Sequence, residues 1–159
     1  MRIDVGGGTI PRSGHTNLDP VHGEGDWRRR AQETPWPALA GSVKSIVASH
    51  VLEHVAAGWE RIAVMNEAHR VLASGGTFEI VLPIVGYTDR ETGAPMSNQI
   101  GWQPWADPTH VSFWWFPESL LYFCEGGFAA NADYGLKLWR LESWDVRDGW
   151  EGHAVLVKP

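Results

Sequence analysis

The residue types best suited to chemistry occur near the start of the chain, where glycines and an acid follow two short predicted strands. The first strand, residues 2–5, runs into a glycine triplet, and Asp19 comes directly after the second strand at residues 15–18. The triplet consists of Gly6, Gly7 and Gly8. Glycines let the backbone approach a ligand closely, and an acid at the tip of the neighbouring strand can accept hydrogen bonds from both hydroxyls of a ribose. The stretch favours a nucleoside site, although a glycine triplet also occurs in ordinary turns.

A second candidate lies in the middle of the chain, where His50, Glu53 and His54 follow the order H-x-x-E-H. This spacing is the signature of one zinc-peptidase group, in which two helical histidines hold zinc and the glutamate is the base. Such enzymes also need a third ligand and a much larger chamber, so we do not favour this interpretation and predict no metal site. His50 follows the predicted strand at residues 43–49, at the mouth of the sheet, and is the better functional candidate.

The third candidate is the sequence Asp107-Pro108-Thr109-His110, which closes a long loop. His110 can act as a general base that takes a proton from a substrate hydroxyl or amine. Asp107 accompanies it as a catalytic candidate. An Asp-Pro turn followed by Thr and His also commonly satisfies its own hydrogen bonds, so both interpretations stay open.

An α/β sheet is expected to position these candidates. Residues 43–49 form a near-continuous apolar run typical of a buried strand, residues 58–72 show helical periodicity, and residues 77–82 form the next predicted strand. A strand, a helix and a strand at this spacing make the right-handed unit of an α/β sheet. The predicted buried face of the helix comprises Trp59, Ile62, Met65 and Leu72.

Three connections shape the expected topology. Residues 9–14 link the first two strands and are too few for the crossover helix of roughly a dozen residues that normally joins parallel strands. Residues 84–108 are broken by glycines and prolines, and we interpret residues 84–110 as a lid or substrate loop. Residues 135–145 and 151–158 are predicted to form a terminal antiparallel hairpin.

Composition narrows the classes of function. The chain has 159 residues, of which 43% are hydrophobic, and this size predicts a single domain over residues 1–159. The net charge of -6 argues against general affinity for nucleic acids or anionic membranes. Cys124 is the lone cysteine, so no internal disulfide can form. No signal peptide or membrane span is expected, and we predict a cytoplasmic protein.

Three blocks together resemble class I S-adenosylmethionine (SAM) methyltransferases of the small bacterial and phage type. The first is the glycine and acid stretch, where G-x-G, P-x-x-G and N-x-D follow in quick succession. The second, residues 35–55, is similar to the PWP, GSVD and SHVLEH segments of that family, with Lys44 in place of an acid. The third, residues 67–77, is similar to E-x-x-R-V-L-x-P-G-G, with Ser74 in place of proline. The resemblance covers roughly residues 1–83.

This resemblance implies a Rossmann-like sheet, mostly parallel with a C-terminal antiparallel hairpin, and compact because the usual N-terminal helices are lacking. It implies SAM as the cofactor and methyl transfer to a small molecule, a sugar or a protein side chain. The glycines would admit the methionine part of SAM, Asp19 would bind the ribose, and the segment at Pro35 would pack against adenine. The residues assigned to the cofactor are Gly6, Gly7, Gly8, Asp19, Pro35, Trp36, Ser49 and His50, and those assigned to catalysis are His110, His50 and Asp107.

Some features depart from the family pattern. The acid that usually precedes the PWP segment and contacts the adenine amino group has no clear equivalent near residues 30–32. A second hypothesis is therefore a methyltransferase-like module that binds or assembles without catalysis. The chain begins almost directly at the first strand, so one edge of the sheet could be bare, and a homodimer or a missing fragment could cover it. The aromatic residues expected to close over an acceptor are Trp102, Trp105, Trp114 and Trp115.

Overall fold

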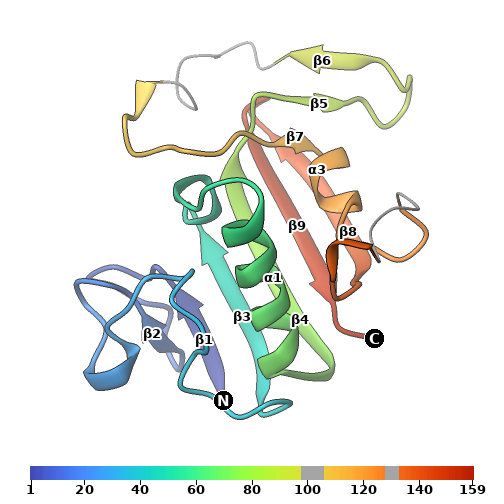
Figure 1. Cartoon of the computed structure of the whole chain (residues 1–159). Helices are drawn as coiled ribbons and strands as arrows, with labels where there is room; N and C mark the ends of the chain where they lie inside the picture. Colours follow the sequence, from blue (N-terminus) through green and yellow to red (C-terminus); the bar gives the residue numbers. More distant parts are fainter. Residues whose placement is uncertain (98–105, 128–132) are drawn as a thin grey trace.

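The computed structural model describes residues 1–97, 106–127 and 133–159 of the chain. Its main element is a six-stranded sheet with the order β2-β1-β3-β4-β9-β8 (Figure 1). The strands are β1 (Arg2–Val5), β2 (Thr16–Leu18), β3 (Val43–Ser49), β4 (Leu72–Pro83), β8 (Arg140–Arg147) and β9 (Glu151–Val157). The first four strands are parallel, and β9 runs antiparallel to both β4 and β8. A mostly parallel sheet with a terminal hairpin is what the sequence predicts.

The helix α1 (Trp59–Val71) covers one face of β3 and β4 (Figure 1). Its residues Val64, Met65 and Ala68 are fully buried and share one core with Ile46 of β3. The prediction that Trp59 belongs to the buried face is wrong, because Trp59 is 74% exposed. This residue begins the helix, and the buried face starts more than one turn later.

The strands β1 and β2 pair in parallel although no helix joins them, which confirms the prediction from the short connection. The Arg12 amide donates a hydrogen bond to Asp4 Oδ2 at 2.7 Å. The Gly7 amide donates to Asn17 Oδ1 at 3.1 Å, and Asn17 Nδ2 donates to the Gly8 carbonyl at 2.9 Å. The Asp4 carboxylate and the Asn17 carboxamide thus satisfy backbone groups that would form hydrogen bonds within a crossover helix.

The strand β4 begins directly after α1, earlier than the predicted start at Thr77. Leu72 pairs with Val43, and the register then shifts before Thr77 pairs with Ser45. Gly75 has a φ of +75°, and its amide donates to the Lys158 carbonyl at 2.8 Å. The glycines Gly75 and Gly76 therefore belong to an irregularity inside β4.

Part of the segment predicted as a loop folds into a second sheet with the order β6-β5-β7. Its elements are β5 (Gly86–Thr88), β6 (Pro95–Ser97) and β7 (Trp115–Phe116), and the short helix α3 (Glu118–Leu121) follows. Figure 1 shows this small sheet beyond the carboxyl ends of β3 and β4. Gly86 leaves room for the Trp115 ring to pack against β5. A role for residues 84–110 as a lid stays a prediction.

The predicted aromatic lid is not assembled as expected. Trp102 and Trp105 lie outside the described residues. Trp114 is fully buried, and the Arg61 guanidinium lies 4.0 Å from the centroid of its ring. The prediction that Trp114 closes over an acceptor is wrong, because its ring belongs to the hydrophobic core. Trp115 is half-buried in β7.

The outer strands of the main sheet are β2 and β8. A homodimer that covers a bare edge of the sheet stays a prediction. In the described part of the chain, no helix combines the length and the apolar character needed to cross a membrane.

Candidate functional site

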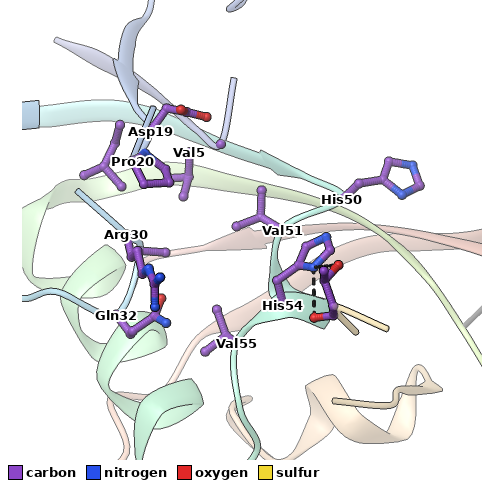
Figure 2. Close-up of a pocket in the computed structure, with 13 residues that line it drawn as sticks. Val5, Asp19, Pro20, Arg30, Gln32, His50, Val51, His54 and Val55 are labelled. Atoms are coloured by element: carbon purple, nitrogen blue, oxygen red, sulfur yellow. Dashed lines mark hydrogen bonds between the residues drawn. The ribbon is translucent and has the colours of Figure 1, made fainter. Parts of the chain in front are cut away.

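A cavity of about 430 Å³ opens at the carboxyl ends of β1, β2 and β3. Ligands of open α/β sheets bind at this edge. Figure 2 shows Asp19 and Pro20 on one side of the cavity, with Val51, His54 and Val55 facing them. The residues that line the cavity are Val5, Gly6, Leu18, Asp19, Pro20, Arg30, Ala31, Gln32, His50, Val51, His54, Val55 and Thr109.

Asp19 follows β2 directly and is 7% exposed. Its Oδ1 accepts hydrogen bonds from the amides of Val21 at 2.8 Å and His22 at 2.7 Å, and its Oδ2 accepts one from the Gly8 amide at 3.1 Å. Burial alone would raise the pKa of Asp19, but the amides of His22, Val21 and Gly8 together hold it below its ordinary value. The carboxylate is therefore ionised and fixed in place, and Oδ2 keeps capacity for a further hydrogen bond.

Gly6, Gly7 and Gly8 differ in what surrounds each of them. Gly6 lines the cavity with a φ of +69°, and a Cβ at this position would collide with the Val51 side chain. A Cβ at Gly7 would come within 2.8 Å of Asn17 Oδ1, so Gly7 serves the connection between the strands. Gly8 faces open space and lines a neighbouring hollow instead of the cavity.

Residues 30–32 form a wall of the cavity, a position that the sequence did not predict for them. Arg30, Ala31 and Gln32 line it, at the place where the family pattern has an acid. Figure 2 shows the Arg30 and Gln32 side chains next to each other on this wall. Asp19 is the acid among the lining residues of the described chain. The missing acid was a signal that could be read from the sequence, but these residues belong to a loop with no periodicity to place them.

One predicted cofactor residue, Trp36, lies behind this wall. Trp36 is 2% exposed, and its Nε1 donates a hydrogen bond to the Ala31 carbonyl at 2.8 Å. Its amide donates to Glu67 Oε1 at 2.6 Å, and Arg70 binds both oxygens of the same carboxylate. The Glu67–Arg70 pair thus fixes Trp36 to α1. Pro35 is exposed and, like the exposed Ser49 at the end of β3, does not line the cavity.

The three predicted catalytic residues meet at a second cavity. His50, Asp107 and His110 line this space of about 560 Å³ together with Pro83 and other residues. His50 lines both cavities, so it stands at the boundary between them. The structure brings these residues together from the end of β3 and from the segment between β6 and β7.

His50 contacts two carboxylates. Its Nδ1 lies 3.5 Å from Glu53 Oε1, and its Nε2 lies 2.9 Å from Glu151 Oε1. Glu53 first, and Glu151 after it, raise the pKa of His50 against the opposing effect of burial. His50 also has a φ of +55°, an uncommon conformation for a residue with a side chain. The imidazole is therefore turned toward the second cavity and held there by acids on both sides.

The D-P-T-H segment combines the two roles left open by the sequence. The amide and the hydroxyl of Thr109 donate hydrogen bonds to Asp107 Oδ1 at 2.8 and 2.5 Å, so the turn satisfies itself. The His110 side chain is 11% exposed, with Nε2 at 3.6 Å from Asp107 Oδ2 and 4.0 Å from Glu53 Oε1. The segment is both a structural turn and a source of a histidine for the second cavity.

Comparisons with known proteins agree with this architecture. Residues 22–80 match a family model described as a methyltransferase domain. A methyltransferase from Haloferax volcanii, solved in complex with the Trm112 methyltransferase activator, aligns with a TM-score of 0.57 at 17% identity, over 99% of this chain and 82% of that chain. No curated protein sequence matches the chain.

Two bacterial structures give similar alignments. A SAM-dependent methyltransferase from Thermotoga maritima has a TM-score of 0.57 at 12% identity, over 99% of this chain and 82% of that chain. A SAM-dependent methyltransferase from Aquifex aeolicus has a TM-score of 0.54 at 12% identity, over 99% and 81% of the two chains. The chain therefore has the Rossmann-like fold of SAM-dependent methyltransferases.

Proposed function

We propose that this chain is a SAM-dependent methyltransferase that acts on a small molecule, a sugar or a protein side chain. The observation that carries the proposal is Asp19, an ionised and fixed carboxylate beside Gly6 in a cavity of about 430 Å³. This volume is within the range of roughly 300–1,000 Å³ for small-molecule sites. The methyltransferase match over residues 22–80 supports the same conclusion.

The cavity suggests how SAM would lie. One ribose hydroxyl would donate to Asp19 Oδ2, and the methionine part would pass over the backbone at Gly6. Adenine would lie against the wall at residues 30–32, where the Gln32 carboxamide can both donate and accept a hydrogen bond. The sulfonium methyl would then point toward His50, at the boundary with the second cavity.

An acceptor in the second cavity would attack the methyl carbon in line with the sulfur. The nucleophile's lone pair forms the new bond to carbon, the carbon–sulfur bond breaks, and its electron pair stays on sulfur as S-adenosylhomocysteine leaves. An oxygen or nitrogen acceptor also loses a proton, which a histidine of this cavity, His50 or His110, can take. Because SAM is already activated, alignment of the acceptor and exclusion of water are the main tasks of the protein.

Calorimetric titration with SAM tests the proposal. We expect the wild-type chain to bind SAM, and Asp19→Asn to lose about 1.5–3 kcal/mol of binding free energy, the range for a hydrogen bond to a charged group. This corresponds to a roughly 10- to 150-fold weaker affinity. Asp26→Asn is the matched control, because Asp26 is a nearby acid that does not line the cavity. Equal SAM affinities for the wild type and Asp19→Asn would contradict the assignment.

The second candidate function is a methyltransferase-like module that binds or assembles without catalysis. The observation in its favour is the wall at residues 30–32, which offers Arg30 where an acid is expected to contact adenine. This alternative predicts no heat on titration with SAM for any variant. Heat in the wild type that is reduced in Asp19→Asn and kept in Asp26→Asn would exclude it.

A further inference from the structure

Three side chains between the two cavities converge on one point. Glu53, His54 and His110 each offer one ligand atom, and these atoms lie within 4.8 Å of one another. Glu53 Oε1 is 3.9 Å from His54 Nε2 and 4.0 Å from His110 Nε2. These distances are too long for hydrogen bonds. One carboxylate oxygen and two imidazole nitrogens thus face one another without bonding directly.

Glu53 is the unusual member of this group. Its side chain is 1% exposed, and neither carboxylate oxygen has a hydrogen-bond partner among the described residues. A buried carboxylate is costly unless a proton, a charged neighbour or a metal ion compensates it. The nearest polar groups are imidazole nitrogens, with His50 Nδ1 at 3.5 Å. His50 offsets part of the cost of burying this charge, but the carboxylate makes no hydrogen bond among the described residues, and His54 and His110 also face it.

His54 is held in the tautomer that a metal ligand needs. Thr109 donates its single hydroxyl proton to Asp107 Oδ1 at 2.5 Å. His54 Nδ1, at 3.2 Å from the Thr109 carbonyl and 3.1 Å from the Thr109 hydroxyl oxygen, must therefore be the donor in that contact. The Nε2 lone pair then faces Glu53. A histidine that donates one ring N–H to a backbone carbonyl while the other nitrogen stays free is typical of metal-binding histidines.

The backbone fixes the two segments that supply the cluster. The amides of Val111 and Ser112 donate to the Glu53 carbonyl at 2.8 and 3.1 Å, and Ser112 Oγ donates to the Leu52 carbonyl at 2.9 Å. His110 is therefore kept beside Glu53 by contacts that do not involve the side chains of the cluster. The site is assembled in advance by the fold.

We propose that Glu53, His54 and His110 bind one divalent transition-metal ion, for which zinc is the best-matched metal. Two imidazoles and one carboxylate are a common zinc ligand set, with metal–ligand distances of roughly 2.0–2.2 Å and a fourth position left open. Ligand atoms of a tetrahedral site lie about 3.4 Å apart, so the side chains must draw together by roughly 0.5–1.4 Å. The half-exposed His54 ring can make most of this movement.

This arrangement differs from that of the H-x-x-E-H peptidases. Those enzymes use both histidines of the motif as ligands from one helix and the glutamate as base. Here the residues Leu52–His54 form a short 3-10 helix, and His50 pairs with Glu151 at 2.9 Å outside the cluster. Glu53 takes the place of a ligand, and His110 from a distant segment supplies the third.

The site would have a defined role if the proposed methyl transfer is correct. His54 lines the cavity assigned to SAM, and His110 lines the second cavity assigned to the acceptor. An ion held by these residues would bind an acceptor that presents an oxygen and would favour loss of its proton. The inference about the acceptor, an oxygen-bearing molecule that can bind a metal, rests on the proposed function; the metal site itself does not.

Metal binding is tested on the full chain after removal of metal with a chelator. Zinc is titrated by calorimetry, and Co²⁺ serves as a coloured probe whose visible absorption reports coordination. We expect one ion per chain, and at least a 100-fold weaker affinity in Glu53→Gln and in His110→Gln. His15→Gln is the matched control, because it also loses one imidazole but lies outside the cluster. Circular dichroism of each variant verifies that it is folded.

The outcomes separate this inference from the proposed function. No bound ion in the wild type, or binding that survives both Glu53→Gln and His110→Gln, overturns the metal site. SAM titrations of the metal-free chain test the methyltransferase proposal separately from the metal site. SAM binding without metal binding would leave the methyltransferase proposal in place and remove the metal site, and metal binding without SAM binding would do the opposite.

Discussion

Replacement of Gly6 by alanine gives a sharp test of how β1 borders the cavity. Gly6 has a φ of +69°, and its amide donates to the Leu18 carbonyl at 2.8 Å, so the backbone cannot easily change. An alanine in this left-handed conformation costs about 1–2 kcal/mol. The added Cβ would also collide with Val51. Overpacking of this kind typically costs about 1–3 kcal/mol, so we expect a total loss of roughly 2–5 kcal/mol.

Gly8→Ala is the matched control for the conformational part. Gly8 also has a positive φ, +57°, but no heavy atom lies within 4 Å of a Cβ built there. This variant should lose only about 1–2 kcal/mol. Urea unfolding monitored by tryptophan fluorescence gives both values. The difference between the two variants isolates the collision with Val51.

A double-mutant cycle tests the collision directly. Val51→Ala removes the methyl groups that a Cβ at Gly6 would meet. We expect Gly6→Ala/Val51→Ala to recover about 1–3 kcal/mol relative to the sum of the single variants. If Gly6→Ala is no less stable than Gly8→Ala, or if the double variant shows no coupling, the close approach of β1 to Val51 is not what selects glycine at position 6.

Three further predictions follow from single side chains. The pKa of Asp19 lies below its ordinary value, so the ionised carboxylate stabilises the folded chain at pH values above the pKa of the unfolded state. This stabilisation should be lost as the pH falls through the lower pKa of the folded state. Urea unfolding should therefore show a stability difference between the wild type and Asp19→Asn at pH 7 that disappears in acid. Glu67→Gln should lower the free energy of unfolding by about 2–3 kcal/mol, because Glu67 accepts a hydrogen bond from the Trp36 amide and pairs with Arg70. An unchanged melting temperature in thermal unfolding would contradict this role. Burial raises the pKa of Cys124 to about 11, so a thiol reagent at pH 8 should react only after unfolding, and rapid reaction of the native chain would contradict its buried position.

The central sheet could be predicted because its signals are local. The apolar run at residues 43–49 became β3 with the same bounds, and α1 began and ended within one residue of residues 58–72. The terminal hairpin turns where Asp148 and Gly149 both have positive φ, which an Asp-Gly pair favours. In each case the residues of the element itself carry the physical reason for its structure.

The small sheet and the tryptophans could not be predicted in this way. The strands β5 and β6 have three residues each, and they contain a glycine and a proline that argue against strands. Trp114 is in the core and Trp59 is exposed, although both are large and apolar. Their burial depends on partners far away in the sequence, such as Arg61 over the Trp114 ring.

The candidate site shows the same division. Gly6 and Asp19 could be placed because each directly follows a strand, and the carboxyl ends of parallel strands share one edge of a sheet. Arg30, Gln32 and Thr109 could not, because loops without periodicity bring them to the cavity. Trp36 was assigned to the cofactor from a motif alone, and the structure places it one layer behind the wall.

The two cavities are supported by different parts of the fold, and this has a consequence for specificity. The cavity assigned to SAM is lined mainly by the ends of β1 and β2 and by residues 30–32. The second cavity depends on the loop at residues 106–110, which is fixed at Glu53 by the backbone amides of Val111 and Ser112. Because backbone contacts hold this loop, side chains such as Pro108 can change without loss of its position. Pro108 lines the second cavity and not the first, so its substitution should alter the choice of acceptor and leave cofactor binding intact.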